Sequence, residues 1–253
     1  MQVSRRVWNN YIRALRKVND RAAAEMTAFL NARNWLTDYS VRQECVNFGY
    51  ALATKYGEAA GELACEMYDA IAATARRVIP PAEPAATATY SETAKSVIGT
   101  MKTGNTETVA GSVGRLVKMA GVDTTMQNAI RDHAEWAWIP SGDSCAFCEV
   151  LASQGWLPAS KAQMDGDHAE HIHANCDCTF AIRFDESTDV AGYEPEKYRE
   201  LYDNAEGNSS QAKINSIRRE NYAKNKEEIN EQKRSAYAKR QELNSSRAEE
   251  GSA

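Results

Sequence analysis

The amino-acid sequence predicts a mainly α-helical protein with a small α+β module near residue 150. Three observations lead to this prediction. Apolar residues recur every three or four positions over the first eighty residues, four of the six cysteines fall within residues 145–178, and the last sixty residues are polar and helix-favouring. We therefore expect a long helical hairpin as the N-terminal body (1–80), a linker with short helices (81–134), the cysteine-rich module (135–190) and a charged helical extension with a disordered end (191–253).

The N-terminal body contains two apolar stripes at helical spacing, which favours a helical hairpin. Asp38 or Ser40 is the expected N-cap of the second helix, and Pro80-Pro81 is expected to end it. The first stripe is Trp8, Ile12, Leu15, Ala22, Met26 and Phe29, and the second is Val41, Cys45, Phe48, Leu52, Tyr56, Ala59, Leu63, Met67 and Ile71.

The segment PPAEPAATAT predicts a short, stiff linker because proline restricts the backbone. Helical patches follow at 91–101 and 109–120, and we expect Gly121 to end the second patch as its C′ residue. A third patch is expected to begin at Thr124, because Thr124 and Gln127 have the spacing of a capping box.

The pattern changes at EWAWIPSGDSC. Alternation of tryptophan with other residues, followed by proline and glycine, predicts a short strand and a tight turn. EVLASQGW then predicts one or two helical turns closed by Gly155. NCDCTFAIRF predicts a second strand, with Cys176, Cys178, Phe180 and Ile182 on one face.

The later cysteines predict a structural zinc site. No segment has the roughly 18 uncharged apolar residues of a membrane span, so we expect a cytoplasmic product, in which clustered cysteines hold metal rather than form disulfides. Zinc prefers tetrahedral thiolate and imidazole ligands. Five candidates compete for four places, and they are Cys145, Cys148, His173, Cys176 and Cys178. The preferred set is the CxxC pair, the histidine and one later cysteine; a four-cysteine set with the histidine behind it is the alternative.

Two other interpretations of the cysteines are weaker. A thioredoxin-type dithiol needs its CxxC at the start of a helix in a βαβ unit, and the sequence pattern offers no such unit. Burial as small apolar residues suits Cys45 and Cys65, which fall within the second predicted helix. It suits the later cluster less, because a C-x2-C…H-x2-C-x-C pattern rarely arises by chance.

The segment DGDHAEHIH beside the cluster allows two interpretations. In a zinc-supported nuclease of the HNH or treble-clef type, His168 or His171 would be the general base beside a catalytic divalent ion. Alternatively, the segment is a solvated acidic loop. We favour the loop, because such nucleases need a metal-binding His or Asn on a following helix, whereas all four histidines precede Asp177.

The C-terminal extension repeats itself at a period of fifteen residues: INSIRRENYAK begins at Ile214 and INEQKRSAYAK at Ile229. Residues 213–240 hold nine Lys or Arg against four Glu, although the whole chain has a net charge of −5. This pattern suits a nucleic-acid-binding adaptor or a solvated helix with Glu–Lys pairs. The candidate contacts are Arg218, Arg219, Lys224, Lys233, Arg234, Lys239 and Arg240.

The segments SGDSCAFCEVLASQGW and HIHANCDCTFAIRF resemble the module of tailed-phage minor head proteins of the Mu F-like head morphogenesis family. That family has a helical region, an Asp before a CxxC, an apolar residue soon after, and a closing HxxCxC strand. The corresponding residues here are Asp143, Cys145, Cys148, Leu151, His173, Cys176 and Cys178. The resemblance covers residues 135–184. Ala174 stands where many relatives have proline and Asp177 where arginine is frequent, and neither change removes a ligand.

The resemblance implies a non-enzymatic virion component, a minor capsid protein of the portal vertex or capsid interior. Its expected partners are the portal protein, the major capsid protein and, through the C-terminal helix, packaged DNA. It would assist head assembly, DNA packaging or DNA delivery after synthesis in the host bacterial cytoplasm. The zinc ion would be structural, because its binding energy serves as folding energy for a module too small to form its own core.

Overall fold

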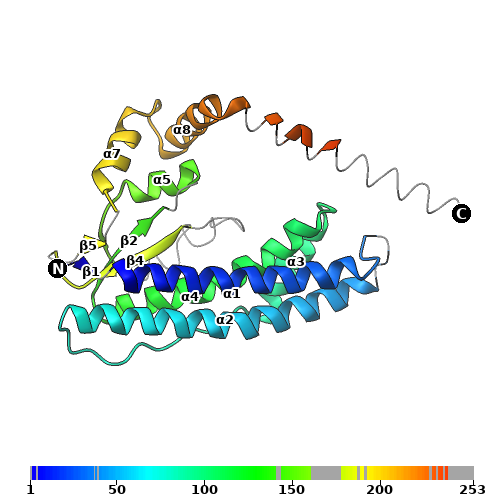
Figure 1. Cartoon of the computed structure of the whole chain (residues 1–253), viewed down its shortest axis with the longest axis horizontal. Helices are drawn as coiled ribbons and strands as arrows, with labels where there is room; N and C mark the ends of the chain where they lie inside the picture. The colour runs from blue at the N-terminus through cyan, green and yellow to red at the C-terminus, as the bar shows by residue number, and fades with distance from the viewer. Residues whose placement is uncertain are drawn as a thin grey trace, which may run out of the picture.

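The computed structural model describes residues 2–3, 5–36, 38, 40–140, 144–160, 178–186, 189–190, 193–227, 230–231, 233–235 and 237–238. Within them, long helices form a bundle, a small sheet lies over part of it, and shorter helices lie beyond the sheet (Figure 1). The mainly helical fold class is confirmed. No helix in the described ranges is long and apolar enough to cross a membrane. The bundle helices are α1 (Arg5–Asn31), α2 (Val41–Thr74), α3 (Tyr90–Met101) and α4 (Thr106–Arg131), and the outer helices are α5 (Ala146–Ala152), α7 (Pro195–Asn204) and α8 (Ser210–Lys224).

The two predicted stripes form the core side of α1 and α2, which pack against each other as the expected hairpin. Leu15 and Met26 of α1 and Ile71 of α2 are buried. Ser40 occupies the N-cap position of α2, but its side chain makes no capping bond and instead donates to the Asp38 carboxylate. The helix ends at Thr74, before the prolines that were expected to end it. Two residues later, Arg76 has φ of 52°, which a right-handed helix does not allow.

The expected break at Gly121 is wrong, because α4 is one helix of 26 residues that packs against α1, α2 and α3. A Cβ on Gly121 would lie 3.2 Å from the carbonyl oxygen of Ala60 on α2, so this glycine permits a close helix contact. The Thr124 hydroxyl donates to the carbonyl of Ala120, one turn earlier. Thr124 therefore lies inside the helix and caps nothing.

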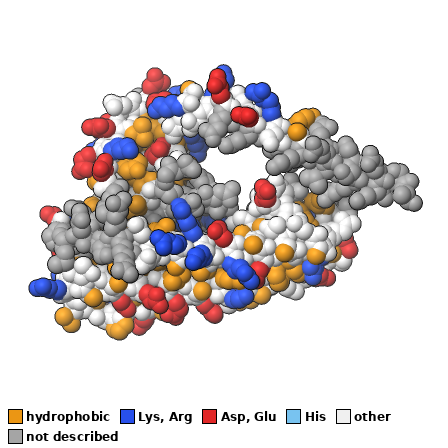
Figure 2. Space-filling view, viewed as in Figure 1, with side chains coloured by type: hydrophobic (Ala, Val, Ile, Leu, Met, Phe, Trp, Pro, Cys, Tyr) orange, Lys and Arg blue, Asp and Glu red, His pale blue; other side chains and the backbone are white. Residues whose placement is uncertain are grey.

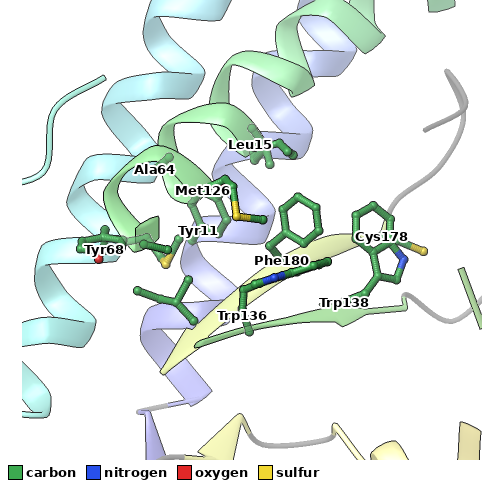
Figure 3. Close-up of a cluster of buried hydrophobic side chains, with 14 of the residues drawn as sticks. Tyr11, Leu15, Ala64, Tyr68, Met126, Trp136, Trp138, Cys178 and Phe180 are labelled. Carbon is green, nitrogen blue, oxygen red and sulfur yellow. The ribbon is translucent and has the colours of Figure 1, made fainter. Parts of the chain in front are cut away.

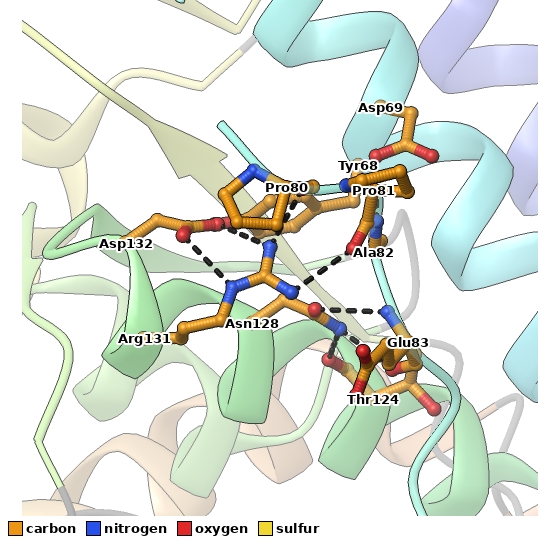
Figure 4. Close-up of polar contacts among 10 residues, drawn as sticks. All are labelled: Tyr68, Asp69, Pro80, Pro81, Ala82, Glu83, Thr124, Asn128, Arg131 and Asp132. Atoms are coloured by element: carbon orange, nitrogen blue, oxygen red, sulfur yellow. Dashed lines mark hydrogen bonds and ion pairs between the residues drawn. The ribbon is translucent and has the colours of Figure 1, made fainter. Parts of the chain in front are cut away.

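The proline-rich linker after α2 is fastened along α4 through its backbone (Figure 4). The Arg131 guanidinium donates to the carbonyl oxygens of Pro80 and Pro81, and the Asn128 amide donates to that of Glu83. These bonds hold the linker in an extended path on the bundle surface. Three more bonds run from the backbone nitrogens of Ala82, Glu83 and Ala85 to the side chains of Asp69, Asn128 and Thr124 respectively.

The predicted strands around the cysteine pair form an antiparallel sheet in the order β3-β2-β4. The strands are β2 (Glu135–Ile139), β3 (Leu157–Pro158) and β4 (Thr179–Arg183). Trp138 of β2 is paired with Phe180 of β4. The strands predicted at EWAWI and in NCDCTFAIRF are thereby confirmed, whereas the two-residue strand β3 was not predicted.

A second pair of strands joins the start of the chain to the far end of the module. β1 (Gln2–Val3) pairs in parallel with β5 (Asp189–Val190). Because β1 comes just before α1, this pairing connects the bundle to the module through backbone hydrogen bonds.

The bundle and the sheet share one hydrophobic core. In Figure 3, side chains of α1, α2 and α4 meet Trp136, Trp138 and Phe180 of the sheet. The Trp138 and Phe180 rings pack edge to face, with centroids 4.5 Å apart. A second cluster around Met26 fills the other half of the bundle, and a third, smaller cluster lies among α5, α7 and α8.

Candidate metal centre

The CxxC pair lies at the start of α5. Cys145 is the N-cap residue in an extended conformation and Cys148 lies in the first turn, so the helix begins between the two cysteines rather than after them. The helix ends at Ala152, and Gly155 follows with φ of 70°, which supports its predicted role in closing this segment. This geometry brings the Sγ atoms of Cys145 and Cys148 to 3.5 Å from each other.

The spacing of the two sulfur atoms suits one shared metal ion. Two thiolates that each lie about 2.3 Å from a tetrahedral zinc ion are about 3.8 Å apart. A disulfide bond requires about 2.05 Å. The 3.5 Å between Cys145 and Cys148 is close to the first distance and far from the second, so the two sulfur atoms are not covalently bonded and lie close enough to bind one ion. These residues fit half of a zinc site.

Cys178 lies directly before β4 and is buried in the same core cluster as Cys148. It precedes Phe180 by two residues, and Phe180 is paired with Trp138 across the sheet. Residues two apart along an extended chain share a face, so Cys178 lies diagonally across from Trp138. Figure 3 shows both side chains in the same part of the cluster.

The indole of Trp138 supplies an unsatisfied donor in this region. Trp138 is 1% exposed, and within the described residues its Nε1 atom has no hydrogen-bond partner. A buried N–H normally has an acceptor, because leaving one unpaired costs about 1–3 kcal/mol. Metal-bound thiolates accept such bonds and are oriented by them. A metal-bound thiolate near Trp138 would therefore supply an acceptor for this indole N–H, which fits the proposed cysteine ligands.

Charged and phenolic groups lie close to the cysteines on the outer side. The Glu149 carboxylate accepts hydrogen bonds from the Ser144 hydroxyl at 3.4 Å and from the Asn221 amide at 3.2 Å. Burial raises the pKa of the Tyr198 phenol, and the neighbouring Glu149 carboxylate and Cys178 thiol raise it further. Tyr198, from α7, thus faces the same end of the module as Cys178.

The other predicted site residues are divided between the bundle and the undescribed part of the chain. Cys45 and Cys65 are buried in the bundle as expected, and burial raises the pKa of the Cys65 thiol to about 11. Within the described residues, no group of three or more His, Cys, Asp or Glu side chains is placed to hold a metal ion. Asp143, His168, His171, His173 and Cys176 lie outside the described residues.

The basic residues of the extension lie on the outer side of α8. Ile214 and Ile217 face inward and are buried, whereas Arg218, Arg219 and Lys224 are exposed. Beyond the helix, the Lys233 ammonium lies 5.5 Å from the centre of the Tyr222 ring. Both acidic and basic side chains lie on the outer helices α7 and α8 (Figure 2). The predicted contacts Lys239 and Arg240 lie outside the described residues.

Two features of the site were not predicted from the sequence. Trp138 was assigned only to a strand, although a tryptophan N–H close to a CxxC already indicates a donor in need of an acceptor. Glu149 was not recognised as the contact between α5 and Asn221 of α8. Its pairing joins residues 72 positions apart, which no local pattern reveals.

A helical bundle, a sheet that shares its core and a thiol pair at the start of α5 define a helical protein with a cysteine module. The family model described as VG15 protein matches residues 2–205, so the chain belongs to the VG15 protein family. VG15 is a family of viral gene proteins, which indicates a phage protein. The match covers the bundle, the sheet and the thiol pair, and it ends before α8. No curated protein and no solved structure matches the chain.

Proposed function

We propose that the chain is a phage minor capsid protein of the head morphogenesis type, located at the portal vertex or inside the capsid. The observation that carries this proposal is the viral family match over residues 2–205, which spans both the helical body and the cysteine module. The resemblance of the cysteine segments to Mu F-like head proteins narrows the viral assignment to the head. The protein assists head assembly, DNA packaging or DNA delivery and acts without an enzymatic step.

The role proposed for the cysteine module is structural. Cys145 and Cys148 would hold a zinc ion together with two of His173, Cys176 and Cys178. The ion supplies folding energy when bound. Burial of the Cys148 side chain in the core shared with the bundle supports this role, because the ligand lies among apolar side chains rather than at an open surface.

Purified particles of the phage that encodes the chain test the location. Mass spectrometry of procapsids and mature heads should detect the protein in low copy number beside the portal protein. Electron cryo-microscopy should show the corresponding density at the portal vertex or the capsid interior, and particles that lack the gene should lose it. Absence of the protein from both kinds of particle would contradict the proposal.

The non-enzymatic part is tested with plasmid nicking in Mg²⁺ or Mn²⁺. The wild-type protein should leave supercoiled plasmid intact. Metal-dependent nicking that disappears in the double substitution His168→Ala and His171→Ala would identify a nuclease instead. Elemental analysis of the same preparation should find about one zinc ion per chain.

Contact with packaged DNA is a second candidate function, and the exposure of Arg218, Arg219 and Lys224 on one helix supports it. Lysine and arginine that neutralise phosphates release counterions, so binding should weaken steeply as salt is raised. Removing residues 213–253 should abolish binding in a filter or fluorescence assay. Equal binding by the truncated and complete chains would exclude this role of the extension.

A further inference from the structure

We infer that the CxxC pair controls the docking of the C-terminal arm, defined as α7 and α8 (residues 195–224). The inference rests on the proposed zinc site and adds a regulated element to it. In this arrangement α5 is a platform: the metal ligands fix its inner side and its first turn, and the arm packs on its outer side. Release of the cysteines frees α5, and the arm then undocks.

The length of α5 makes it dependent on its neighbours. The helix has seven residues, from Ala146 to Ala152. Isolated helices shorter than about 12–15 residues are marginal in water, so packing and end contacts hold this one in place. Its N-cap residue is Cys145, whose side chain forms no capping bond to the backbone. The start of α5 therefore has no side-chain cap from Cys145, and a metal ion bound to Cys145 and Cys148 would fix it.

The inner side of α5 belongs to the core shared with the sheet and the bundle. Cys148, Leu151 and Ala152 are buried in that cluster with Trp136 and Trp138. Cys145 packs against the same cluster with part of its surface exposed. The two metal ligands thus occupy the inner side and the beginning of one short helix.

The outer side of α5 forms the seat of the arm. Ala146 and Val150 are buried against Ile214 and Ile217 of α8 in a small cluster of their own. The Asn221 amide, one turn further along α8, donates to the Glu149 carboxylate at 3.2 Å. The buried cluster and the hydrogen bond from Asn221 to Glu149 together extend over about two turns of α8, so α5 positions α8.

The two helices of the arm are also tied to each other. The Lys213 ammonium donates to the carbonyl oxygen of Tyr202 at 2.7 Å, and the Ser216 hydroxyl accepts from the backbone nitrogen of Glu206 at 3.1 Å. The Tyr193 hydroxyl, just before α7, donates to the carbonyl of Ala152 at the end of α5. The arm is thus one unit attached to both the side and the end of α5.

Coupling of this kind is reciprocal. If metal binding at the cysteines stabilises the docked arm, the docked arm must raise the metal affinity by the same factor. Coupling free energies of this type correspond to about 5–150-fold changes in affinity. The inference therefore makes one prediction at the arm and a matching one at the metal.

Hydrogen exchange of the complete chain tests the arm. Removal of zinc with a chelator should raise the exchange rate of the α8 amides at residues 214–224 by about tenfold or more, while the α2 amides remain protected. Adding zinc back should restore protection. The α2 amides report whether the bundle is still folded, so loss of the whole fold is distinguished from undocking.

Zinc competition with a coloured chelator tests the other direction. Ile217→Ala removes buried contacts between α8 and α5 without touching a cysteine, and it should weaken zinc retention by about 5–150-fold. Arg218→Ala, at the adjacent exposed position, is the matched control and should retain zinc as the wild type does.

Each outcome separates the inference from the function proposed above. The coupling is overturned if zinc binds but its removal leaves the exchange of the α8 amides unchanged and Ile217→Ala binds zinc as tightly as the wild type. The zinc ion would then be structural only. A chain that binds no zinc overturns both the zinc site and the coupling. Neither result bears on whether the protein is found in phage heads.

Discussion

The bundle and the cysteine module achieve order by different means. The bundle uses helices of 27, 34 and 26 residues, and its side chains fill a core of its own around Met26 in addition to the core shared with the sheet. The module uses five-residue strands and a seven-residue helix, and the cluster that seats the arm contains five buried residues. Small units of this kind usually need a staple such as a metal ion or disulfides.

The contrast teaches where a single substitution acts. In the bundle, many buried contacts along the long helices each contribute to stability, so a single substitution lowers the free energy of unfolding by a limited amount. In the module, two sulfur atoms lie together at the start of α5, and α8 packs against that short helix through a small buried cluster.

The largest effect is expected from Cys148→Ser. A serine at a zinc ligand position should lower zinc affinity by more than about 100-fold, beyond the 10–100-fold loss seen for residues that only orient ligands. The module should lose its protection in hydrogen exchange while α2 keeps it. The comparison is Cys65→Ser, which buries a hydroxyl in the bundle and should cost about 1–3 kcal/mol of unfolding free energy with zinc retained. Equal zinc affinity in both variants would remove the distinction between the two regions.

Asp123→Asn should stabilise the bundle in a pH-dependent way. Burial raises the pKa of Asp123 from 3.8 to about 6, and the nearby Glu92 adds to the shift. The folded state therefore holds this proton more tightly, so the stability due to the protonated form is complete below pH 3.8 and is lost as pH rises through about 6. Above pH 7, Asp123→Asn should raise the free energy of unfolding by up to about 3 kcal/mol relative to the wild type.

Urea unfolding at pH 4 and pH 7.5 measures the Asp123→Asn effect, which should be small at the lower pH. Glu58→Gln on the exposed side of α2 is the control and should leave stability nearly unchanged at both values. A gain from Asp123→Asn that is the same at both pH values would show that packing, rather than charge, causes it.

Gly121→Ala should destabilise the bundle by about 1–2 kcal/mol, despite the better helix propensity of alanine. The added Cβ would lie 3.2 Å from the Ala60 carbonyl oxygen, which belongs to backbone and cannot turn aside. Thermal unfolding monitored by circular dichroism measures the change. A more stable variant would show that α2 and α4 can separate slightly at no cost.

The smallest effect is expected from Gly99→Ala on α3. A Cβ there meets nothing within 4 Å, so the substitution gains helix propensity alone and should add about 0.5–1 kcal/mol. The same unfolding experiment applies, and the opposite signs at Gly121 and Gly99 form the test. A loss at both positions would indicate that backbone flexibility, not the contact with α2, explains the two glycines.

The local periodicity of apolar residues was sufficient to predict the paired helices α1 and α2 and the strands β2 and β4. The helix ends were harder to predict. Thr124 and Gln127 were expected to form a capping box, but the structure forms that motif at Thr89 and Glu92. The spacing is the same at both places. The difference is that Thr124 lies inside α4, where it is buried under the linker and accepts a hydrogen bond from the Ala85 backbone nitrogen. This tertiary contact cannot be read from residue spacing.

The metal centre could be predicted only in part for a similar reason. Ligand spacing identified the CxxC pair, and the structure places its sulfur atoms together. The contacts that make α5 a platform join residues such as Glu149 and Asn221, which are distant in the chain. The fastening of the linker to Arg131 was equally unpredictable, because it uses carbonyl oxygens that every residue carries.

The pairing of β1 with β5 sets an order of events during synthesis. Gln2 is paired with Asp189, so β1 must wait for the synthesis of 187 further residues before its partner exists. At about 5–20 residues per second this takes roughly 10–40 s. Helices α1 to α4 are complete well before then. The bundle can therefore form while its first residues are still unpaired, and joining the two ends of the matched region is among the last steps in folding.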